Sequence, residues 1–318
     1  MKRILLFLLI SIILSIDTIE ARDSTFYNKQ NIREYGRNKI ESVDDMVKIF
    51  YGKQIYIYVP SITNKTNSIN LPSDISSMVR SLFNSTGNSI TLLSYVNRNN
   101  LPKEEVFIIN GAITAFDIDG ESTENGLQLS GEGKKAEELA SISMKDNKNR
   151  KITKLGITFN PSNAKTGFYI SRTSTSNTID IQETSDSDAT TYSILGVVID
   201  SKDRSLESDG VHHSLRVLIE VSTIEVLGRL VKYPYWLLTK TEINPDIFDY
   251  LVKEFIRDSL NEKLKKISYL LSLKDGSLEV TSTINSQLRE AIINYKREHG
   301  LAPNDIISSR LYKSLLGA

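Results

Sequence analysis

A strand, a helix and two further strands follow one another between residues 53 and 116, and this order constrains the fold more than any other feature. The segment Lys53–Pro60, KQIYIYVP, alternates Ile and Val with Tyr at period two, which is typical of a half-buried strand. An amphipathic helix is predicted over Leu71–Gly87, and strands over Ser89–Tyr95 and Val106–Phe116. The last strand is apolar almost throughout, so we expect it to lie inside a sheet. Together these elements predict an α/β layer.

The first residues have the organisation of an export signal. Lys2 and Arg3 are followed by the apolar run Ile4–Ile16. This run is shorter than the about 20 residues that a membrane-spanning helix needs. We therefore expect a signal peptide over 1–21 with cleavage after Ala21, the alternative being an uncleaved anchor. Residues 22–47 are polar and predict an N-terminal arm, either extended or helical.

Composition limits the chemistry. The chain of 318 residues has 39 basic and 39 acidic residues, so it lacks the basic excess of a nucleic-acid-binding protein. It has no cysteine, so hydrophobic cores rather than disulfides must stabilise an exported chain. The same absence excludes a cysteine-dependent transpeptidase.

The C-terminal stretch predicts two short helices around a turn. One apolar stripe at helical period comprises Ile284, Leu288, Ala291, Ile292 and Tyr295. Gly300 stands where the left-handed C-cap of the first helix is expected, and Pro303 prevents that helix from continuing. We expect Asn304 or Asp305 to cap a second helix, whose inner face carries Ile307, Leu311 and Leu315.

This stretch, INSQLREAIINYKREHGLAPNDIISSRLYKSLL, resembles the C-terminal half of a peptidoglycan-binding domain of the three-helix type. The segment LKDGSLEV at Leu273–Val280 is similar to the first loop of that domain. Two departures stand out. Lys296 replaces a frequent glutamine, and Pro303-Asn304-Asp305 replaces the usual Asp-Gly turn. The resemblance implies a small all-α domain over 267–318 that binds peptidoglycan.

The predicted peptidoglycan-binding residues lie on these helices and their turn. Basic side chains there can meet the carboxylates of the wall, although each can equally be solvated surface. The predicted set is Arg289, Tyr295, Lys296, Asp305 and Arg310.

The middle of the chain resembles a second family. QIYIYVP-SITN, a helix opened by LPSDI, ITLLSY and VFIINGAITAFD are similar in order to the periplasmic core of the curli-secretion CsgG family, a relative of the TolB N-terminal fold. SLRVLIEVSTIEVLGRL at Ser214–Leu230 resembles that family's long strand pair. The resemblance implies a CsgG-like α/β domain over 48–266 that assembles as a ring.

A large departure from that family spans residues 121–200. Members of the curli channel family insert β-hairpins there into lipid, and each spanning strand needs about 9–11 residues. Here the alternation at Leu155, Ile157 and Phe159 is broken by Asn160-Pro161-Ser162-Asn163. We therefore interpret this segment as a polar β-hairpin insertion that does not build a membrane pore. The predicted fold class is thus an α/β (α+β) sheet-and-helix domain with a β-hairpin insertion, plus a small all-α C-terminal domain.

Two motifs that suggest metal binding are incomplete. Asp117–Glu121, DIDGE, lacks the later ligands of a calcium loop, so we predict a solvated acidic turn. His212 and His213 are adjacent and would point to opposite faces of a strand, with His299 the one other histidine. We predict no metal and no cofactor.

Asn244-Pro245-Asp246 predicts the start of a helix that runs to about Lys266. Asn244 caps it, Pro245 takes its first position and Asp246 favours the positive end of the helix dipole.

Two function classes compete. The first is a non-enzymatic periplasmic scaffold that binds peptidoglycan and joins other subunits, as a homo-oligomeric ring, in an outer-membrane-associated complex of a secretion or flagellar machine. The second is a peptidoglycan-targeted cell-wall hydrolase that uses carboxylates, for which no segment shows a recognisable context. We predict the scaffold, with no nucleic-acid partner and no catalytic residues.

Overall fold

The computed structural model describes residues 32–121, 150–184, 190–194, 197–201 and 210–317. It divides into two compact units, Met1–Lys39 and Ile40–Ala318. In the first unit, the described residues are the beginning of helix α2 (Ile32–Met46). The predicted signal peptide and its cleavage site lie outside the described residues, as do residues 122–149 of the predicted insertion.

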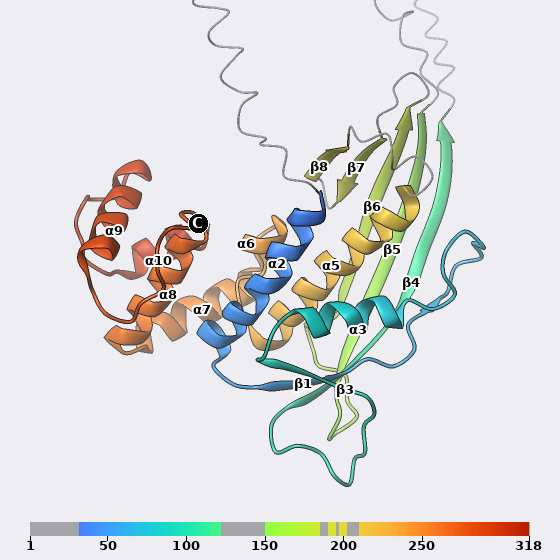
Figure 1. Ribbon diagram of the computed structural model, residues 1–318, viewed down its shortest axis with the longest axis horizontal. Coiled ribbons are helices and arrows are strands. Elements are labelled where there is room, and N and C mark those ends of the chain that lie inside the picture. Colours follow the sequence, from blue (N-terminus) through green and yellow to red (C-terminus); the bar gives the residue numbers. More distant parts are fainter. Residues whose placement is uncertain (1–31, 122–149, 185–189, 195–196, 202–209, 318) are drawn as a thin grey trace, which may run out of the picture. The chain divides into compact units, whose positions relative to one another are not determined.

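One mixed sheet organises the second unit (Figure 1). Its order is β3-β1-β4-β5-β6-β7-β8, with β2 paired to β4. β1 is parallel to β3 and β4, whereas β4 to β8 form an antiparallel series. The strands are β1 (Ile55–Tyr58), β2 (Thr63–Asn64), β3 (Ile90–Leu93), β4 (Val106–Glu121), β5 (Arg150–Asn163), β6 (Thr175–Thr184), β7 (Thr190–Ile194) and β8 (Val197–Ser201). The predicted α/β class is confirmed.

Helices α3 (Ser76–Ser85) and α5 (Gly210–Val231) cover one face of this sheet (Figure 1). The alternation predicted for β1 is confirmed, because Ile55 and Ile57 are buried while Tyr56 and Tyr58 are partly exposed. β4 lies between β1 and β5, as its apolar sequence predicts. The buried face of the sheet carries Ile55, Ile57, Ile109, Ile113, Leu155, Ile157, Phe159, Ile179 and Ile181.

The described part of the predicted insertion continues the sheet instead of standing apart from it. β4 extends to Glu121, so Asp117–Glu121 is strand paired with β5 rather than an acidic turn. β5 also runs through Pro161, where a break was predicted. Pairing of β5 with β6 ends at Phe159, so Pro161 lies where β5 has a strand on one side only, and a proline is tolerated at such an edge.

The segment Ser214–Leu230, expected to be a strand pair, is part of the helix α5. Nearly all side chains from Ser214 to Gly228 are buried, so the helix is apolar on most of its circumference and has no polar stripe to reveal its period. Its length of 22 residues without proline favours a helix over a strand. His212 and His213 therefore lie on a helix, not a strand.

Three helices follow α5. These are α6 (Trp236–Thr239), α7 (Pro245–Arg257) and α8 (Leu260–Ser272). The predicted cap of α7 is confirmed, because Asn244 Oδ1 accepts from the Ile247 N–H at 3.1 Å. The helix expected to reach Lys266 instead ends at Arg257. Ser259 and Glu262 form a capping box that starts α8, because each side chain accepts from the other residue's backbone N–H.

The tail consists of α9 (Ser286–Glu298) and α10 (Ser309–Leu315). Leu288, Ile292 and Tyr295 of the predicted stripe are buried, whereas Ile284 precedes the helix and is exposed. Gly300 has φ 65°, and the Leu301 N–H donates to the Lys296 carbonyl at 2.8 Å, which completes the predicted C-cap.

The second tail helix begins later than predicted. Ser308, rather than Asn304 or Asp305, caps α10, because its Oγ accepts from the Leu311 N–H at 3.3 Å.

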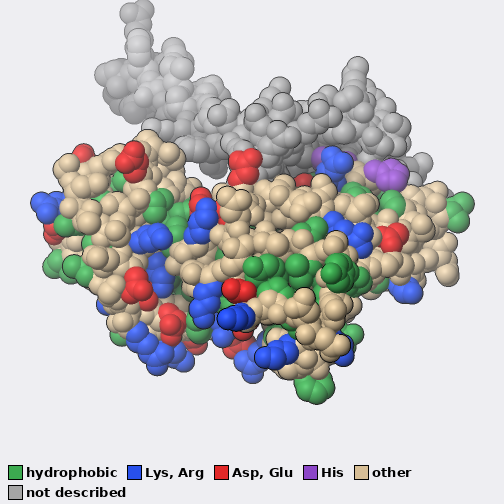
Figure 2. Space-filling model, turned by 60° about the horizontal axis from the view of Figure 1, so that its bottom comes forward, with side chains coloured by type: hydrophobic (Ala, Val, Ile, Leu, Met, Phe, Trp, Pro, Cys, Tyr) green, Lys and Arg blue, Asp and Glu red, His purple; other side chains and the backbone are tan. Residues whose placement is uncertain are grey.

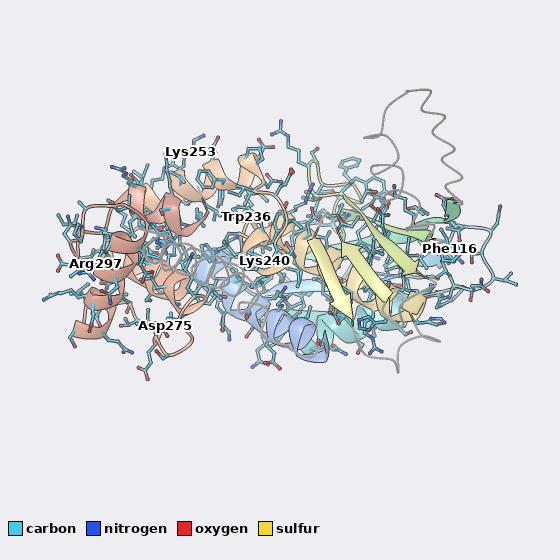
Figure 3. All side chains as sticks on the ribbon, turned by 90° about the horizontal axis from the view of Figure 1, so that it is seen from above. Phe116, Trp236, Lys240, Lys253, Asp275 and Arg297 are labelled. Carbon is cyan, nitrogen blue, oxygen red and sulfur yellow. The ribbon has the colours of Figure 1, made fainter. Side chains whose placement is uncertain are left out.

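The tail packs directly on the preceding helices. The Tyr312 ring stacks on Phe255 of α7 with centroids 4.0 Å apart, and Trp236 Nε1 donates to the Leu316 carbonyl at 2.9 Å. Figure 3 shows Lys253, Asp275 and Arg297 projecting outward, and these three are exposed whereas Trp236 is buried. The domain boundary expected at 266/267 falls inside α8, and residues 40–318 form one compact unit.

Candidate functional site

The structure brings Arg289 and Asp305 of the predicted tail site together. Arg289 Nε lies 3.0 Å from Asp305 Oδ2, and both side chains are about half exposed. A solvent-exposed ion pair of this kind contributes only about 0.2–1 kcal/mol. Arg289 is therefore at the surface, but its charge is already partly matched by the chain itself. Arg310, at the start of α10, is exposed.

Lys296 is used inside the fold. Its Nζ donates to Asn304 Oδ1 at 2.6 Å and to the Ile306 carbonyl at 2.7 Å, and the residue is 4% exposed. Burial lowers the pKa of the Lys296 ammonium, and Asp305 opposes that shift. Lys296 therefore fixes the turn between α9 and α10 and does not present its charge to an external ligand.

Tyr295 is also turned inward. Its ring stacks on His299 with centroids 3.9 Å apart, and its hydroxyl lies 3.1 Å from Ser314 Oγ. Burial raises the pKa of Tyr295. Two of the five predicted residues are thus internal, two form one surface pair, and Arg310 has its own exposed position. These five side chains do not line either of the two cavities described below.

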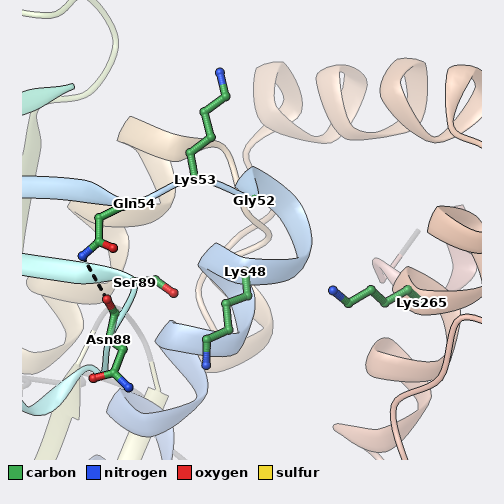
Figure 4. Close-up of a pocket in the computed structure, with 7 residues that line it drawn as sticks. All are labelled: Lys48, Gly52, Lys53, Gln54, Asn88, Ser89 and Lys265. Carbon is green, nitrogen blue, oxygen red and sulfur yellow. Dashed lines mark hydrogen bonds between the residues drawn. The ribbon is translucent and has the colours of Figure 1, made fainter. Parts of the chain in front are cut away.

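A basic pocket of about 370 Å³ lies where the end of η1 meets β1, the turn before β3, and α8 (Figure 4). The short π-helix η1 (Val47–Tyr51) ends at Gly52, which has φ 72°. Its N–H donates to the Val47 carbonyl at 2.8 Å, and this turn directs the chain into β1. The pocket is lined by Lys48, Gly52, Lys53, Gln54, Asn88, Ser89 and Lys265. A second, open cavity of about 620 Å³ is lined by residues 65–70 and 114–117.

One of the three pocket lysines is paired. Lys48 forms an ion pair with Asp44, and its Nζ lies 3.8 Å from Asp45 Oδ1. The hydrogen bond to Asp44 raises the pKa of Lys48. Burial opposes ionisation of Asp44, but hydrogen bonds from Lys48 and from the Ser89 N–H outweigh it, so the pKa of Asp44 is lowered. Asp44 and Lys48 thus fix the pocket wall.

The other two lysines also line the pocket, although the Lys53 side chain extends away from Lys265 in Figure 4 and its Nζ lies 6.0 Å from the centre of the Tyr51 ring. Lys53 and Lys265 are exposed, and within the described residues neither has an ion-pair partner. Figure 4 shows the Lys265 side chain extending toward the pocket from α8, on the side opposite Gln54. Gln54 is fixed by its donation to the Asn88 carbonyl at 3.0 Å and to Thr91 Oγ1 at 2.6 Å. This arrangement suits an anion such as a carboxylate.

Sequence reasoning missed this pocket. Lys53 and Lys265 are far apart in the chain, and neither belongs to a motif. The one available signal was Gly52 before a strand, which marks a turn but does not indicate what approaches it.

A buried polar cluster joins α5 to β6. Asn177 Nδ2 donates to Glu225 Oε2 at 2.6 Å and to Ser222 Oγ at 3.1 Å. Arg229 donates to Glu225 Oε1 at 2.9 Å and to the Ser174 carbonyl at 3.0 Å. Neither cavity reaches this cluster, so its role is to pair the buried Glu225 charge and fix the helix on the sheet.

Within the described residues there is no group of three or more His, Asp or Glu side chains that could hold a metal ion. His299 is part of the tail, where its Nδ1 lies 2.8 Å from the Tyr295 carbonyl. No helix in the described part of the chain is both long enough and apolar enough to cross a membrane.

Comparison with known proteins gives no family. No protein-family model matches the chain, and no curated protein matches it either. The chain aligns with a solved structure of a homolog of the neuraminyllactose-binding hemagglutinin from Helicobacter pylori. The alignment covers 65% of this chain and 92% of that chain, with 10% identity and a TM-score of 0.26. So low a TM-score does not establish a shared fold.

Proposed function

We propose that the protein is a non-enzymatic periplasmic scaffold subunit that binds peptidoglycan and assembles into an outer-membrane-associated ring. The observation that carries the proposal is the basic pocket, which is lined by Lys48, Lys53 and Lys265, the last two without ion-pair partners among the described residues. The stem peptides of peptidoglycan carry carboxylates, which are the anions that two such ammonium groups attract.

The attachment of the tail supports a scaffold over a tethered hydrolase. Tyr312 and Leu316 are buried against α7 and α6, so no flexible linker separates the tail from the rest of the second unit. A targeting module of an enzyme gains reach from such a linker. A pocket built into the compact unit, with Lys265 contributed by α8, would instead hold the polymer at a fixed position on the subunit.

The alternative, a carboxylate-dependent wall hydrolase, receives less support. A general acid of that class needs a carboxyl with a raised pKa. The four described carboxyls with a shifted pKa, Asp44, Asp74, Glu262 and Asp275, are all shifted downward. In the last three the first cause is a hydrogen bond from a nearby serine, which stabilises the carboxylate.

The pocket is tested by replacing Lys53 and Lys265 with glutamine in the full chain and sedimenting the protein with purified sacculi. Two exposed charge contacts at about 0.2–1 kcal/mol each predict binding about 2- to 30-fold weaker than that of the wild type. Higher salt should weaken wild-type binding and affect the variant less.

The matched control is Lys253→Gln with Lys313→Gln, which removes the same charge from exposed positions outside the pocket. If both variants lost the same amount of sacculus binding, only net charge would matter, and this result would contradict peptidoglycan binding at the pocket. Two readouts on the same preparation separate the other parts of the proposal. Clearing of a wall-containing gel would favour the hydrolase, and a strict monomer in light scattering would contradict the ring.

A further inference from the structure

Three large aromatic side chains are unusually exposed at one end of the sheet. Tyr95 is 72% exposed, Phe168 76% and Tyr169 70%. Tyr95 lies in the β3–β4 loop, residues 94–105, and the other two lie in the β5–β6 loop, residues 164–174. Single exposed apolar side chains are common, whereas several of them on one continuous surface mark an interaction site.

The two loops are neighbours. Gly167 has φ 75°, and a Cβ at that position would lie 3.1 Å from Arg98 Nη2, so the Arg98 guanidinium rests against the β5–β6 loop. Figure 1 shows both loops extending from the same end of the sheet. Their residues therefore form one continuous surface, which we call the aromatic end.

The β5–β6 loop is held in shape by its own hydrogen bonds. The Gly167 N–H donates to the Asn163 carbonyl at 2.7 Å, and the Asn163 N–H donates to the Phe168 carbonyl at 2.9 Å. Asn163 Oδ1 also accepts from the Lys165 N–H at 2.9 Å. Phe168 and Tyr169 are thus presented by a defined turn, and little ordering of that turn is needed for them to bind.

Basic residues outnumber acidic residues on this end. The two loops, residues 94–105 and 164–174, contain four basic residues, Arg98, Lys103, Lys165 and Arg172, and two acidic residues, Glu104 and Glu105. Arg172 is paired with Asp246 at 3.0 Å, which ties the β5–β6 loop to the start of α7. Both acids are exposed, and Glu105 accepts from the Tyr51 hydroxyl at 2.7 Å. Figure 2 shows basic and hydrophobic side chains together where the structure projects downward.

We propose that the aromatic end docks onto the surface of an anionic lipid bilayer. Aromatic rings are favoured at the depth of the lipid headgroups, where one part of the ring is in contact with acyl chains and polar atoms stay hydrated. Arg98, Lys103 and Lys165 then face the anionic headgroups, and this attraction extends over about a Debye length. Tyr95, Phe168 and Tyr169 line neither of the two cavities described above, and all three rings are largely exposed.

This inference goes beyond the proposed wall contact and concerns different residues. The basic pocket attracts an anion by charge alone, whereas the aromatic end combines charge with apolar insertion. A scaffold with both surfaces would contact the wall polymer and a membrane.

The test uses a tryptophan reporter in the full chain. Phe168→Trp places an indole at the aromatic end, and the native Trp236 is buried and gives a constant background. With vesicles of phosphatidylcholine and phosphatidylglycerol, emission of the new tryptophan should move to shorter wavelength and be quenched by brominated acyl chains. The control Ile306→Trp, exposed in the tail, should show neither change. The position of the reporter separates this docking from any contact made by the apolar N-terminal segment.

The second part of the test removes the other two aromatic rings. Adding Tyr95→Ser and Tyr169→Ser to the reporter variant should weaken its vesicle response by about 10-fold or more, since interfacial binding scales with buried apolar area. Folding is checked by thermal unfolding, and these exposed sites should leave it unchanged. Sacculus binding should also be unchanged. This readout distinguishes a failure of membrane docking from a failure of the proposed peptidoglycan binding.

Three outcomes would overturn the inference in whole or in part. One is an unchanged emission of the Phe168→Trp reporter with anionic vesicles. Another is a shift produced by soluble glycan chains but not by vesicles, which would make the aromatic end a carbohydrate-binding surface. Equal response to vesicles of phosphatidylcholine alone would remove the role assigned to the basic residues and overturn the anionic specificity.

Discussion

At the scale of single residues, several charged side chains, among them one predicted to bind a ligand, connect parts of the fold instead. Lys296 closes the tail turn, and Glu225 is matched by Asn177 and Arg229. Asp44 is the third example, because it accepts from the Ser89 N–H at 2.7 Å and from Lys48, and so connects α2 to the turn before β3. The availability of a charge to a ligand depends on these bonds, which the sequence does not display.

Asp44 predicts a pH dependence of stability. Its folded pKa is lowered below the unfolded value of about 3.9, so the carboxylate stabilises the fold above that pH, and its contribution is lost as the pH falls through the folded pKa. Asp44→Asn should reduce the free energy of unfolding by about 1–3 kcal/mol at neutral pH. Denaturant titrations should show the difference from wild type shrinking below about pH 4. A difference that stays constant to low pH would contradict this role.

At the scale of elements, the largest error of sequence reasoning was α5. Short amphipathic elements such as β1 and α9 were predictable, because one face is buried and the other is not. α5 is buried nearly all round and rich in β-branched residues, so its pattern also fits a strand pair. The break at Asp258 was missed for another reason. The apolar stripe continues from α7 into α8, and only the Ser259–Glu262 capping box marks the boundary.

Gly228 shows how closely α5 meets the chain that follows it. An added Cβ would lie 2.5 Å from Tyr235 Cβ, an atom next to the backbone that cannot rotate away. Gly228→Ala should therefore lower the free energy of unfolding by about 1–3 kcal/mol, although alanine has the higher helix propensity. Gly276→Ala is the control, since nothing lies within 4 Å of its added Cβ. Equal stability of the two variants would contradict this close contact.

At the scale of the whole molecule, the candidate site follows from contacts that no local pattern contains. The caps of α7 and α9 could be placed from Asn244 and Gly300 alone. The basic pocket requires the packing of η1 on α8, which brings Lys53 and Lys265 to the lining of one pocket. The aromatic end requires the β3–β4 loop to lie against the β5–β6 loop. Such proximity depends on the fold, which explains why the tail residues chosen from sequence and the pocket found in the structure differ.

The integration of the tail gives a prediction for the whole chain. A chain that ends at Lys266 stops inside α8 and loses Tyr312 and Leu316, so it exposes Phe255 and Trp236. We expect a loss of more than about 4 kcal/mol, seen as a red-shifted Trp236 emission and a lower unfolding temperature. The control is Tyr312→Phe, which keeps the ring stack and removes a buried hydroxyl without a hydrogen-bond partner among the described residues. A truncated chain with unchanged unfolding would show that the tail is a separate domain.

The hydrogen bond from the Tyr269 hydroxyl to the Ser42 carbonyl, 3.2 Å long, joins residues 227 positions apart. At a synthesis rate of about 5–20 residues per second, the segment around Ser42 waits roughly 10–50 s for this partner to leave the ribosome. Helix α2 therefore cannot complete its packing during vectorial synthesis. The N-terminal part of a nascent chain of this protein should stay incompletely folded until almost all of the chain has been made.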